Sequence, residues 1–121
     1  MTRGTTRVFL AALLASAASA VAAHAELERA VPAAGSAVRK SPPRLMLMFT
    51  QRLEPAFSKV SVLTRTGKRI DIADSKVDAV DATRLSVGLP KLAPGTYRVR
   101  WRVLSVDTHV SEGDFTFDVQ P

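Results

Sequence analysis

Two histidines, His24 and His109, and one aspartate, Asp107, are the residues of this chain best suited to metal chemistry. Imidazole nitrogens and carboxylate oxygens are ligands for divalent transition metals such as copper(II), nickel and zinc. Asp107 and His109 are separated by one residue, and in an extended backbone such residues point to the same side. By itself an Asp-x-His pair is a weak indication of a metal site. The position of His24 makes it stronger.

The segment before His24 has the layout of a secretory signal peptide. It begins with Arg3 and Arg7, continues with the apolar run 8–15 and ends in small residues from Ser16 to Ala23. The apolar run is too short to span a membrane as a helix, and this order is typical of an export signal. We therefore predict a signal peptide at residues 1–23 and an exported domain at residues 24–121.

Two cleavage positions satisfy the rule that small residues flank the cut. A cut after Ala23 makes His24 the N-terminal residue, whereas a cut after Ala25 removes it. Sequence rules do not separate the two. An N-terminal histidine offers its α-amine and its Nδ1 in one chelate ring, which no internal histidine does. With Asp107 and His109, the first cut gives the nitrogen and oxygen donors that copper(II) prefers in a tetragonal plane.

Length and composition limit the other possibilities. A chain of 121 residues with 46% hydrophobic residues suits one domain with a small core. The absence of cysteine excludes disulfides and thiolate metal sites. Without Arg3 and Arg7, 15 basic and 11 acidic residues remain, a net charge of +4. Many of these charges alternate with apolar residues, which predicts a solvated sheet face rather than a nucleic-acid surface. No segment after the leader approaches the length of a membrane span.

From residue 24 onward, apolar and polar residues alternate and prolines interrupt the chain, as in an all-β domain. The longest alternation places Tyr97, Val99, Trp101 and Val103 on the core face. Arg65-Thr66-Gly67 is expected to form a hairpin turn. Short strands are expected at 24–29, 44–50, 58–64, 68–72, 76–80, 83–89, 97–103 and 114–119. This number of strands predicts a small antiparallel Greek-key barrel or sandwich, cupredoxin-like or immunoglobulin-like.

Four segments of the chain carry a recognisable pattern. They are His24-Ala25-Glu26-Leu27 with Ala30-x-Pro32-x-x-Gly35; Pro43-x-Leu45-x-Leu47-x-Phe49; Leu92-Ala93-Pro94-Gly95-Thr96-Tyr97-x-Val99-x-Trp101-x-Val103-x-Ser105-x-Asp107-x-His109; and Gly113-x-Phe115-x-Phe117. In these segments the chain resembles the CopC family of periplasmic copper-binding proteins, along nearly its whole length after the leader. The third segment is long and specific.

This resemblance implies a periplasmic β-domain that binds copper(II) through an N-terminal histidine, an aspartate and a second histidine. Those roles fall on His24, Asp107 and His109. It also implies that the mature chain begins at His24, in agreement with a cut after Ala23. We expect a monomeric, non-enzymatic protein for copper sequestration, resistance or delivery. Its partners would be the copper ion and an inner-membrane copper transporter or another periplasmic copper protein.

The chain departs from its apparent relatives in two respects. Some relatives carry a second, methionine-rich copper(I) site with an added histidine. Here Met46 and Met48 alternate with core residues on an expected strand and no third histidine is present, which predicts packing rather than copper(I) binding. Many relatives also have an acidic residue soon after the strand that ends near Phe49. Gln51 stands there in this chain, with Glu54 three residues later, so a second carboxylate beside the site stays an open question.

Two other functions fit parts of the pattern. A copper oxidase or oxygenase can also use an N-terminal histidine brace, and an immunoglobulin-like interaction module needs no metal at all. The first would require copper to cycle between two oxidation states, and the second predicts no dependence on His24. If copper does bind, its affinity should fall as the pH drops, because the amine and the imidazoles must lose their protons to become ligands.

Overall fold

A computed structural model of the chain describes residues 24–121, together with residue 4. The predicted signal peptide therefore lies outside the described residues, apart from that single position. The elements are β1 (Leu27–Val31), β2 (Ala37–Val38), β3 (Arg44–Phe49), the 3-10 turn η1 (Pro55–Phe57), β4 (Lys59–Leu63), β5 (Lys76–Val77), β6 (Arg84–Gly88), β7 (Gly95–Leu104) and β8 (Val110–Val119). Within this part of the chain, no helix is long and apolar enough to cross a membrane.

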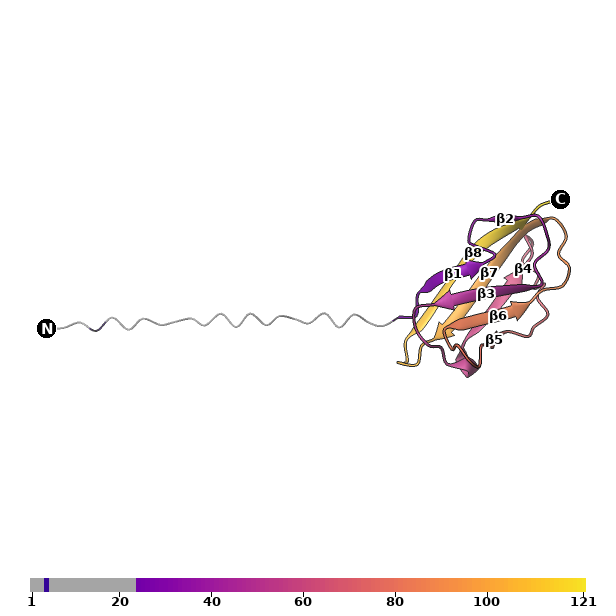
Figure 1. The fold of residues 1–121 in the computed structure, drawn as a ribbon. Coiled ribbons are helices and arrows are strands. Elements are labelled where there is room, and N and C mark those ends of the chain that lie inside the picture. Colours follow the sequence, from indigo (N-terminus) through magenta and orange to yellow (C-terminus); the bar gives the residue numbers. More distant parts are fainter. Residues whose placement is uncertain (1–3, 5–23) are drawn as a thin grey trace.

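The strands form two four-stranded sheets packed face to face (Figure 1). One sheet has the order β1-β3-β6-β5 and the other the order β2-β8-β7-β4. With β1 and β3 to β8 taken as strands A to G, these are the ABED and CFG sheets of an immunoglobulin-type sandwich. The predicted all-β fold is confirmed, in its immunoglobulin-like form. One pairing is not antiparallel, because β2 runs parallel to β8.

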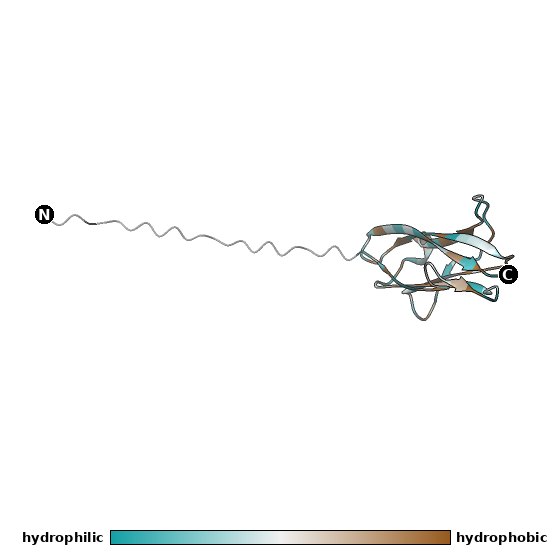
Figure 2. Cartoon of the chain, turned by 90° about the horizontal axis from the view of Figure 1, so that it is seen from above, coloured by the Kyte–Doolittle hydropathy of each residue, from teal (hydrophilic) through white to brown (hydrophobic). Residues whose placement is uncertain are grey.

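The core lies between the two sheets, and hydrophobic and hydrophilic residues are interspersed along the strands (Figure 2). On β3, Leu45, Leu47 and Phe49 are buried, whereas Met46 and Met48 are half-buried on the outer face. Such a period of two is what a strand with one core face requires. The predicted alternation on β3 is therefore confirmed, and the same holds for β7, where the arginines lie outward.

Two aromatic residues of β7, Tyr97 and Trp101, pack in different parts of the sandwich. The Tyr97 hydroxyl donates a hydrogen bond to the Ala93 carbonyl at 2.6 Å, and the ring stacks on Phe117. A tyrosine at the start of strand F that bonds back to the upstream backbone is the tyrosine corner of immunoglobulin-like domains. Trp101 is half-buried and packs edge-on against Phe49 from the facing sheet. Both residues serve packing, as their inward spacing predicts.

Two predicted strands are wrong or too long, and aspartates explain both. The segment 68–72 forms only an isolated bridge between Arg69 and Leu63. The Asp71 carboxylate replaces a backbone carbonyl there and accepts the Val62 N–H at 2.8 Å. The strand predicted at 76–80 ends at Val77, because the Asp78 carboxylate accepts backbone N–H groups two and three residues onward. Aspartate commonly competes with strand pairing in this way.

Two other boundaries differ as well. β8 begins at Val110, four residues before its predicted start, because it pairs with β7 along the full length of both strands. β1 begins at Leu27 rather than at residue 24. Before it, the Glu26 N–H donates to the Thr50 side chain instead of to a backbone carbonyl, so regular strand pairing does not extend to residue 24. The short strand β2 was not predicted.

Gly113 leaves room for the Trp101 ring, its direct cross-strand partner. A Cβ at Gly113 would lie 2.5 Å from Cζ2 of that ring, so Gly113→Ala must displace it. We expect the substitution to lower the free energy of unfolding by about 1–3 kcal/mol. Since Trp101 is the sole tryptophan, its emission should also shift to the red. Urea unfolding and fluorescence measure both effects. Unchanged stability and emission would contradict this packing, and Thr116→Ala, on the outer face of β8, serves as the control for emission.

Candidate metal centre

The first described residues after the predicted leader are fixed to the end of β3. Ala25 is fully buried in the core. The Glu26 N–H donates to the Thr50 hydroxyl at 3.0 Å, and the Thr50 N–H donates to the Glu26 carbonyl at 2.9 Å. His24 itself is exposed. The backbone next to His24 is therefore held in place while its imidazole remains accessible.

Asp107 and His109 lie in the loop that joins β7 to β8. The Thr108 N–H donates to the Ser105 carbonyl at 2.9 Å, and the Ser105 N–H donates to the His109 carbonyl at 3.0 Å. Thr108 has a φ of 72°, in the left-handed region. The extended backbone assumed from the sequence is thus wrong for this loop. A tight turn, rather than strand alternation, brings the two side chains together, with Asp107 Oδ1 3.4 Å from His109 Nδ1.

Residues 50–53 connect the two parts of the candidate site. Thr50 holds Glu26, as described above. The Arg52 carbonyl accepts the Val106 N–H at 2.9 Å, and Leu53 forms an isolated bridge with Ser105. Leu53 is 1% exposed, so its side chain anchors this segment in the core. We call residues 50–53 the bracket, because one short segment positions both the start of the domain and the β7–β8 loop.

The bracket places His24 against His109. Their ring centroids are 5.0 Å apart in an edge-on arrangement. The segment that leads into β1 and the β7–β8 loop lie at the same end of the sandwich (Figure 1). The side chains of His109 and Asp107 are 45% and 38% exposed, so a solvated ion can reach them. Within the described part of the chain, no three His, Asp or Glu side chains already stand in metal-binding positions. A metal would therefore need the Asp107 carboxylate or an imidazole to turn toward it.

Ser105 directly precedes the loop and contacts one of its candidate ligands. It is fully buried, and its hydroxyl donates a hydrogen bond to Asp107 Oδ1. This bond and the His109 imidazole hold the pKa of Asp107 below its usual value, although partial desolvation acts in the opposite direction. Asp107 is thus an anionic oxygen donor at neutral pH. The only signal for this contact in the sequence is a serine after a strand, two positions before the aspartate of Asp-x-His.

The same geometry argues against a serine hydrolase. A nucleophilic serine is hydrogen-bonded to the imidazole of its histidine and open to a substrate. The Ser105 hydroxyl is instead buried and directed at the carboxylate.

Gln51 and Glu54 lie within and just after the bracket, and neither side chain forms a hydrogen bond with another described residue. Among residues 24–121, no second carboxylate forms a hydrogen bond or ion pair with Asp107 or His109.

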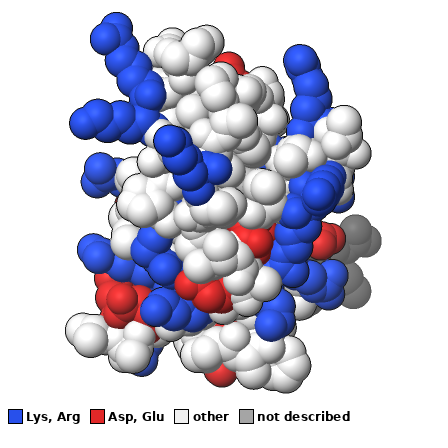
Figure 3. All heavy atoms as spheres, turned by 90° about the vertical axis from the view of Figure 1, so that its right-hand side faces the viewer, with Lys and Arg blue, Asp and Glu red and all other residues white. Residues whose placement is uncertain are grey.

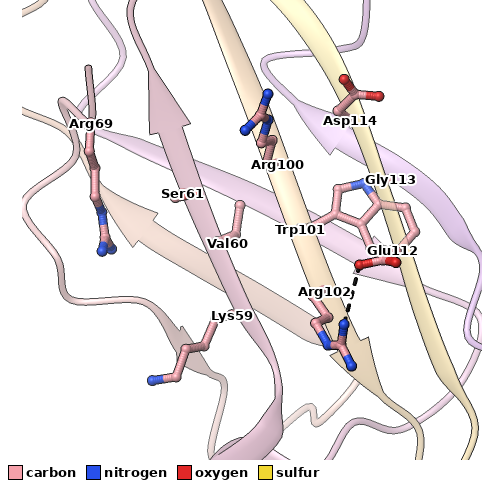
Figure 4. Close-up of a pocket in the computed structure, with 10 residues that line it drawn as sticks. All are labelled: Lys59, Val60, Ser61, Arg69, Arg100, Trp101, Arg102, Glu112, Gly113 and Asp114. Atoms are coloured by element: carbon pink, nitrogen blue, oxygen red, sulfur yellow. Dashed lines mark hydrogen bonds and ion pairs between the residues drawn. The ribbon is translucent and has the colours of Figure 1, made fainter. Parts of the chain in front are cut away.

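Two surface hollows lie away from His24, Asp107 and His109. One, of roughly 490 Å³, lies on the outer face of β4, β7 and β8 (Figure 4). Arg102 pairs there with Glu112 at 3.5 Å, and Arg98 pairs with Asp114 at 2.6 Å beside it. A second, of roughly 600 Å³, lies between the Pro42-Pro43 turn and Leu92. Basic side chains project separately around the far end of the sandwich, with acidic ones among them (Figure 3). The charges form a mixed surface rather than a single basic stripe.

A scan of protein families matches residues 27–120 to the CopC domain. Protein YobA of Escherichia coli strain K12 is 36% identical over 99 residues, which cover 81% of this chain and 80% of that protein. Copper resistance protein C of Xanthomonas campestris pv. juglandis is 35% identical over 122 residues, which cover 96% and 94%. Copper transport protein CutJ of Bacillus subtilis is 26% identical over 98 residues, which cover 80% of this chain but 18% of that longer protein.

Solved structures agree with this relationship. CopC from Methylosinus trichosporium OB3b is 40% identical with a TM-score of 0.76, and the match covers 81% of this chain and 95% of that one. PcoC, a methionine-rich copper resistance protein from Escherichia coli, is 34% identical with a TM-score of 0.70, and the match covers 81% and 100%. At these identities, both the sandwich and the family are shared.

The lowered pKa of Asp107 predicts a specific titration. Because the folded-state pKa lies below the unfolded one, the charged carboxylate stabilises the folded loop above the ordinary aspartate pKa of about 3.9. That contribution is lost as the pH falls through the folded-state value. We expect NMR of the side-chain carboxyl carbons in the metal-free domain to show Asp107 titrating below about 3.9. Asp107→Asn assigns the signal, and a midpoint at or above the ordinary value would contradict the observed contacts.

Proposed function

Since the chain belongs to the CopC family, we propose that it is an exported copper(II)-binding protein that holds its ion through His24, Asp107 and His109. One observation carries this proposal. The ring centroids of His24 and His109 are 5.0 Å apart, and Asp107 Oδ1 lies 3.4 Å from His109 Nδ1. These are the chain's only two histidines, and they are 85 positions apart in the sequence. The fold brings both imidazoles, which are metal ligands of intermediate softness, to one exposed place where a metal can reach them.

The donor set suits copper(II) as cargo. When His24 is the first residue, its α-amine and Nδ1 supply two nitrogens, His109 supplies a third and Asp107 supplies an anionic oxygen. Three nitrogens and one oxygen fit a tetragonal plane, the geometry that copper(II) prefers. The chain has no cysteine, and Met46 and Met48 lie on the outer face of β3. Nitrogen and oxygen donors without soft sulfur favour copper(II) over copper(I).

Burial of Ala25 supports cleavage of the leader after Ala23. Ala25 is fully buried, and Glu26 is bonded to Thr50 through its backbone. A cut after Ala25 would remove a core side chain together with His24, whereas a cut after Ala23 keeps both and frees the His24 amine. Residues 1–23 would then be the signal peptide and residues 24–121 the mature periplasmic domain.

The exposure of the donors suits a carrier that both takes up and passes on its ion. Asp107 and His109 are open to solvent, so a partner can approach the metal directly. One chain supplies every proposed donor, so a monomer is sufficient. The likeness to part of a longer protein named for copper transport supports delivery to an inner-membrane transporter or to another periplasmic copper protein. Sequestration of the ion for copper resistance uses the same site.

Export and copper binding are tested together. We expect the protein expressed with its leader to be recovered from the periplasm with a mass that begins at His24. It should bind one copper(II) with a tetragonal, nitrogen-rich EPR signal. His24→Ala and His109→Ala each remove a nitrogen donor and should weaken binding at least about 100-fold, as judged by competition with a chelator.

A matched control isolates the amine of His24. One alanine added before His24 keeps its imidazole but moves the free amine out of the chelate ring, so it should weaken copper binding about as strongly as His24→Ala does. A mature chain that begins at Glu26, or copper binding that is indifferent to both histidines, would contradict the proposed function.

Reduction separates a carrier from a copper oxygenase. An oxygenase must cycle its copper, whereas the Asp107 carboxylate adds negative charge that stabilises copper(II). We expect the copper-loaded protein to keep its EPR signal for many minutes in ascorbate under air, with no sustained oxygen consumption. Rapid loss of the signal with continuous oxygen uptake, absent in His24→Ala, would contradict the carrier assignment and favour an enzyme.

A further inference from the structure

We propose that the buried hydroxyl of Ser105 is a positioning group that reserves one carboxylate oxygen of Asp107, so that this aspartate offers the metal a single oxygen. The inference rests on the proposed function, because it concerns a ligand of that site. It goes further in assigning a role to a residue that is not itself a ligand. It also predicts how the site selects its metal.

Ser105 contacts both residues that the loop contributes. Its side chain is fully buried. The hydroxyl donates to Asp107 Oδ1 and accepts the His109 N–H at 3.3 Å, while the His109 carbonyl lies 3.2 Å from the same oxygen. A serine hydroxyl has one proton to donate, and here its closest acceptor is the carboxylate. One side chain therefore orients the carboxylate and closes the backbone turn beneath it.

The two contacts of Asp107 Oδ1 differ in how easily a metal can displace them. The His109 imidazole is 3.4 Å away and 45% exposed, so it can turn outward to bind a metal. Ser105 has no such freedom, because it is fully buried just after β7 and its backbone forms a bridge with Leu53. When His109 turns away, Oδ1 stays bonded to Ser105 and Oδ2 remains free for the metal.

A single carboxylate oxygen has a consequence for metal choice. Copper(II) with three nitrogens has one strong position left in its tetragonal plane, and one oxygen fills it. A carboxylate that binds through both oxygens would crowd this plane, whereas zinc has no geometric preference from its d-electrons and tolerates more varied coordination. Ser105 would therefore raise the preference of the site for copper(II) over zinc.

Ser58 provides a matched control for the loss of a buried hydroxyl. It is 1% exposed and lies next to the same end of β7. Its hydroxyl accepts the Leu104 N–H at 3.1 Å and lies 3.4 Å from the Leu104 carbonyl, so it contacts backbone alone. Ser58→Ala removes a buried hydroxyl of similar environment without touching Asp107. General loosening of the fold should thus appear in both variants, and a change at the metal in only one.

The experiment compares the exported form that begins at His24 with Ser105→Ala, Ser105→Thr and Ser58→Ala. Loss of an outer hydrogen bond to a metal ligand typically costs 10- to 100-fold in affinity, so Ser105→Ala should weaken copper(II) binding by about that factor. It should also change the copper hyperfine splitting in EPR and lower the ratio of copper to zinc affinity. Ser105→Thr keeps a hydroxyl and should restore the wild-type spectrum. Ser58→Ala should bind copper with the wild-type spectrum.

A second readout needs no metal. In the metal-free protein, the His109 amide should exchange with solvent at least about tenfold faster in Ser105→Ala than in wild type, because its acceptor is lost. If Ser105→Ala keeps the wild-type affinity, spectrum and exchange while His24→Ala loses copper, the inference is overturned and the proposed function stands. If Ser58→Ala alters the spectrum as Ser105→Ala does, the positioning role is also overturned. Failure of the wild-type protein to bind copper through His24 would instead overturn the proposed function.

Discussion

The candidate site depends on the bracket, the four residues 50–53 that follow β3. Thr50 bonds to the backbone of Glu26, and Arg52 and Leu53 bond to the turn at Ser105 and Val106. These contacts join segments that are far apart in the sequence but lie at the same end of the sandwich. Without them nothing in the backbone would hold His24 beside the β7–β8 loop. Backbone bonds and buried side chains, rather than the donor residues themselves, set the geometry.

The site combines a rigid base with exposed donors. Ala25, Leu53 and Ser105 are each no more than 1% exposed, whereas the imidazoles and the carboxylate face solvent. The buried base of such a site can keep its shape without a metal, and the exposed donors can pass the ion to a partner without the opening of a lid. A closed site would hold the ion more securely but release it more slowly. The open arrangement is thus consistent with the proposed carriage of copper.

The sequence was sufficient for the fold class, because alternation is a regular feature. It also singles out His24, Asp107 and His109, whose role as metal ligands stays a prediction. Alternation predicted the strands and their core faces, and two histidines with one neighbouring aspartate left few choices for a metal site. The failures have local causes. Asp71 and Asp78 replace backbone acceptors with carboxylates and end pairing, which alternation does not reveal. The left-handed Thr108 and the buried bond from Ser105 to Asp107 depend on tertiary packing, so spacing alone suggested an extended loop.

The central claim is that copper(II) joins the first residue of the mature chain to the β7–β8 loop. A crystal structure of the copper-loaded exported protein tests this most directly. The account predicts one copper bound by the amine and Nδ1 of His24, one nitrogen of His109 and one oxygen of Asp107, with Ser105 still bonded to the other oxygen. Copper held at another place, or bound without His24, would contradict it.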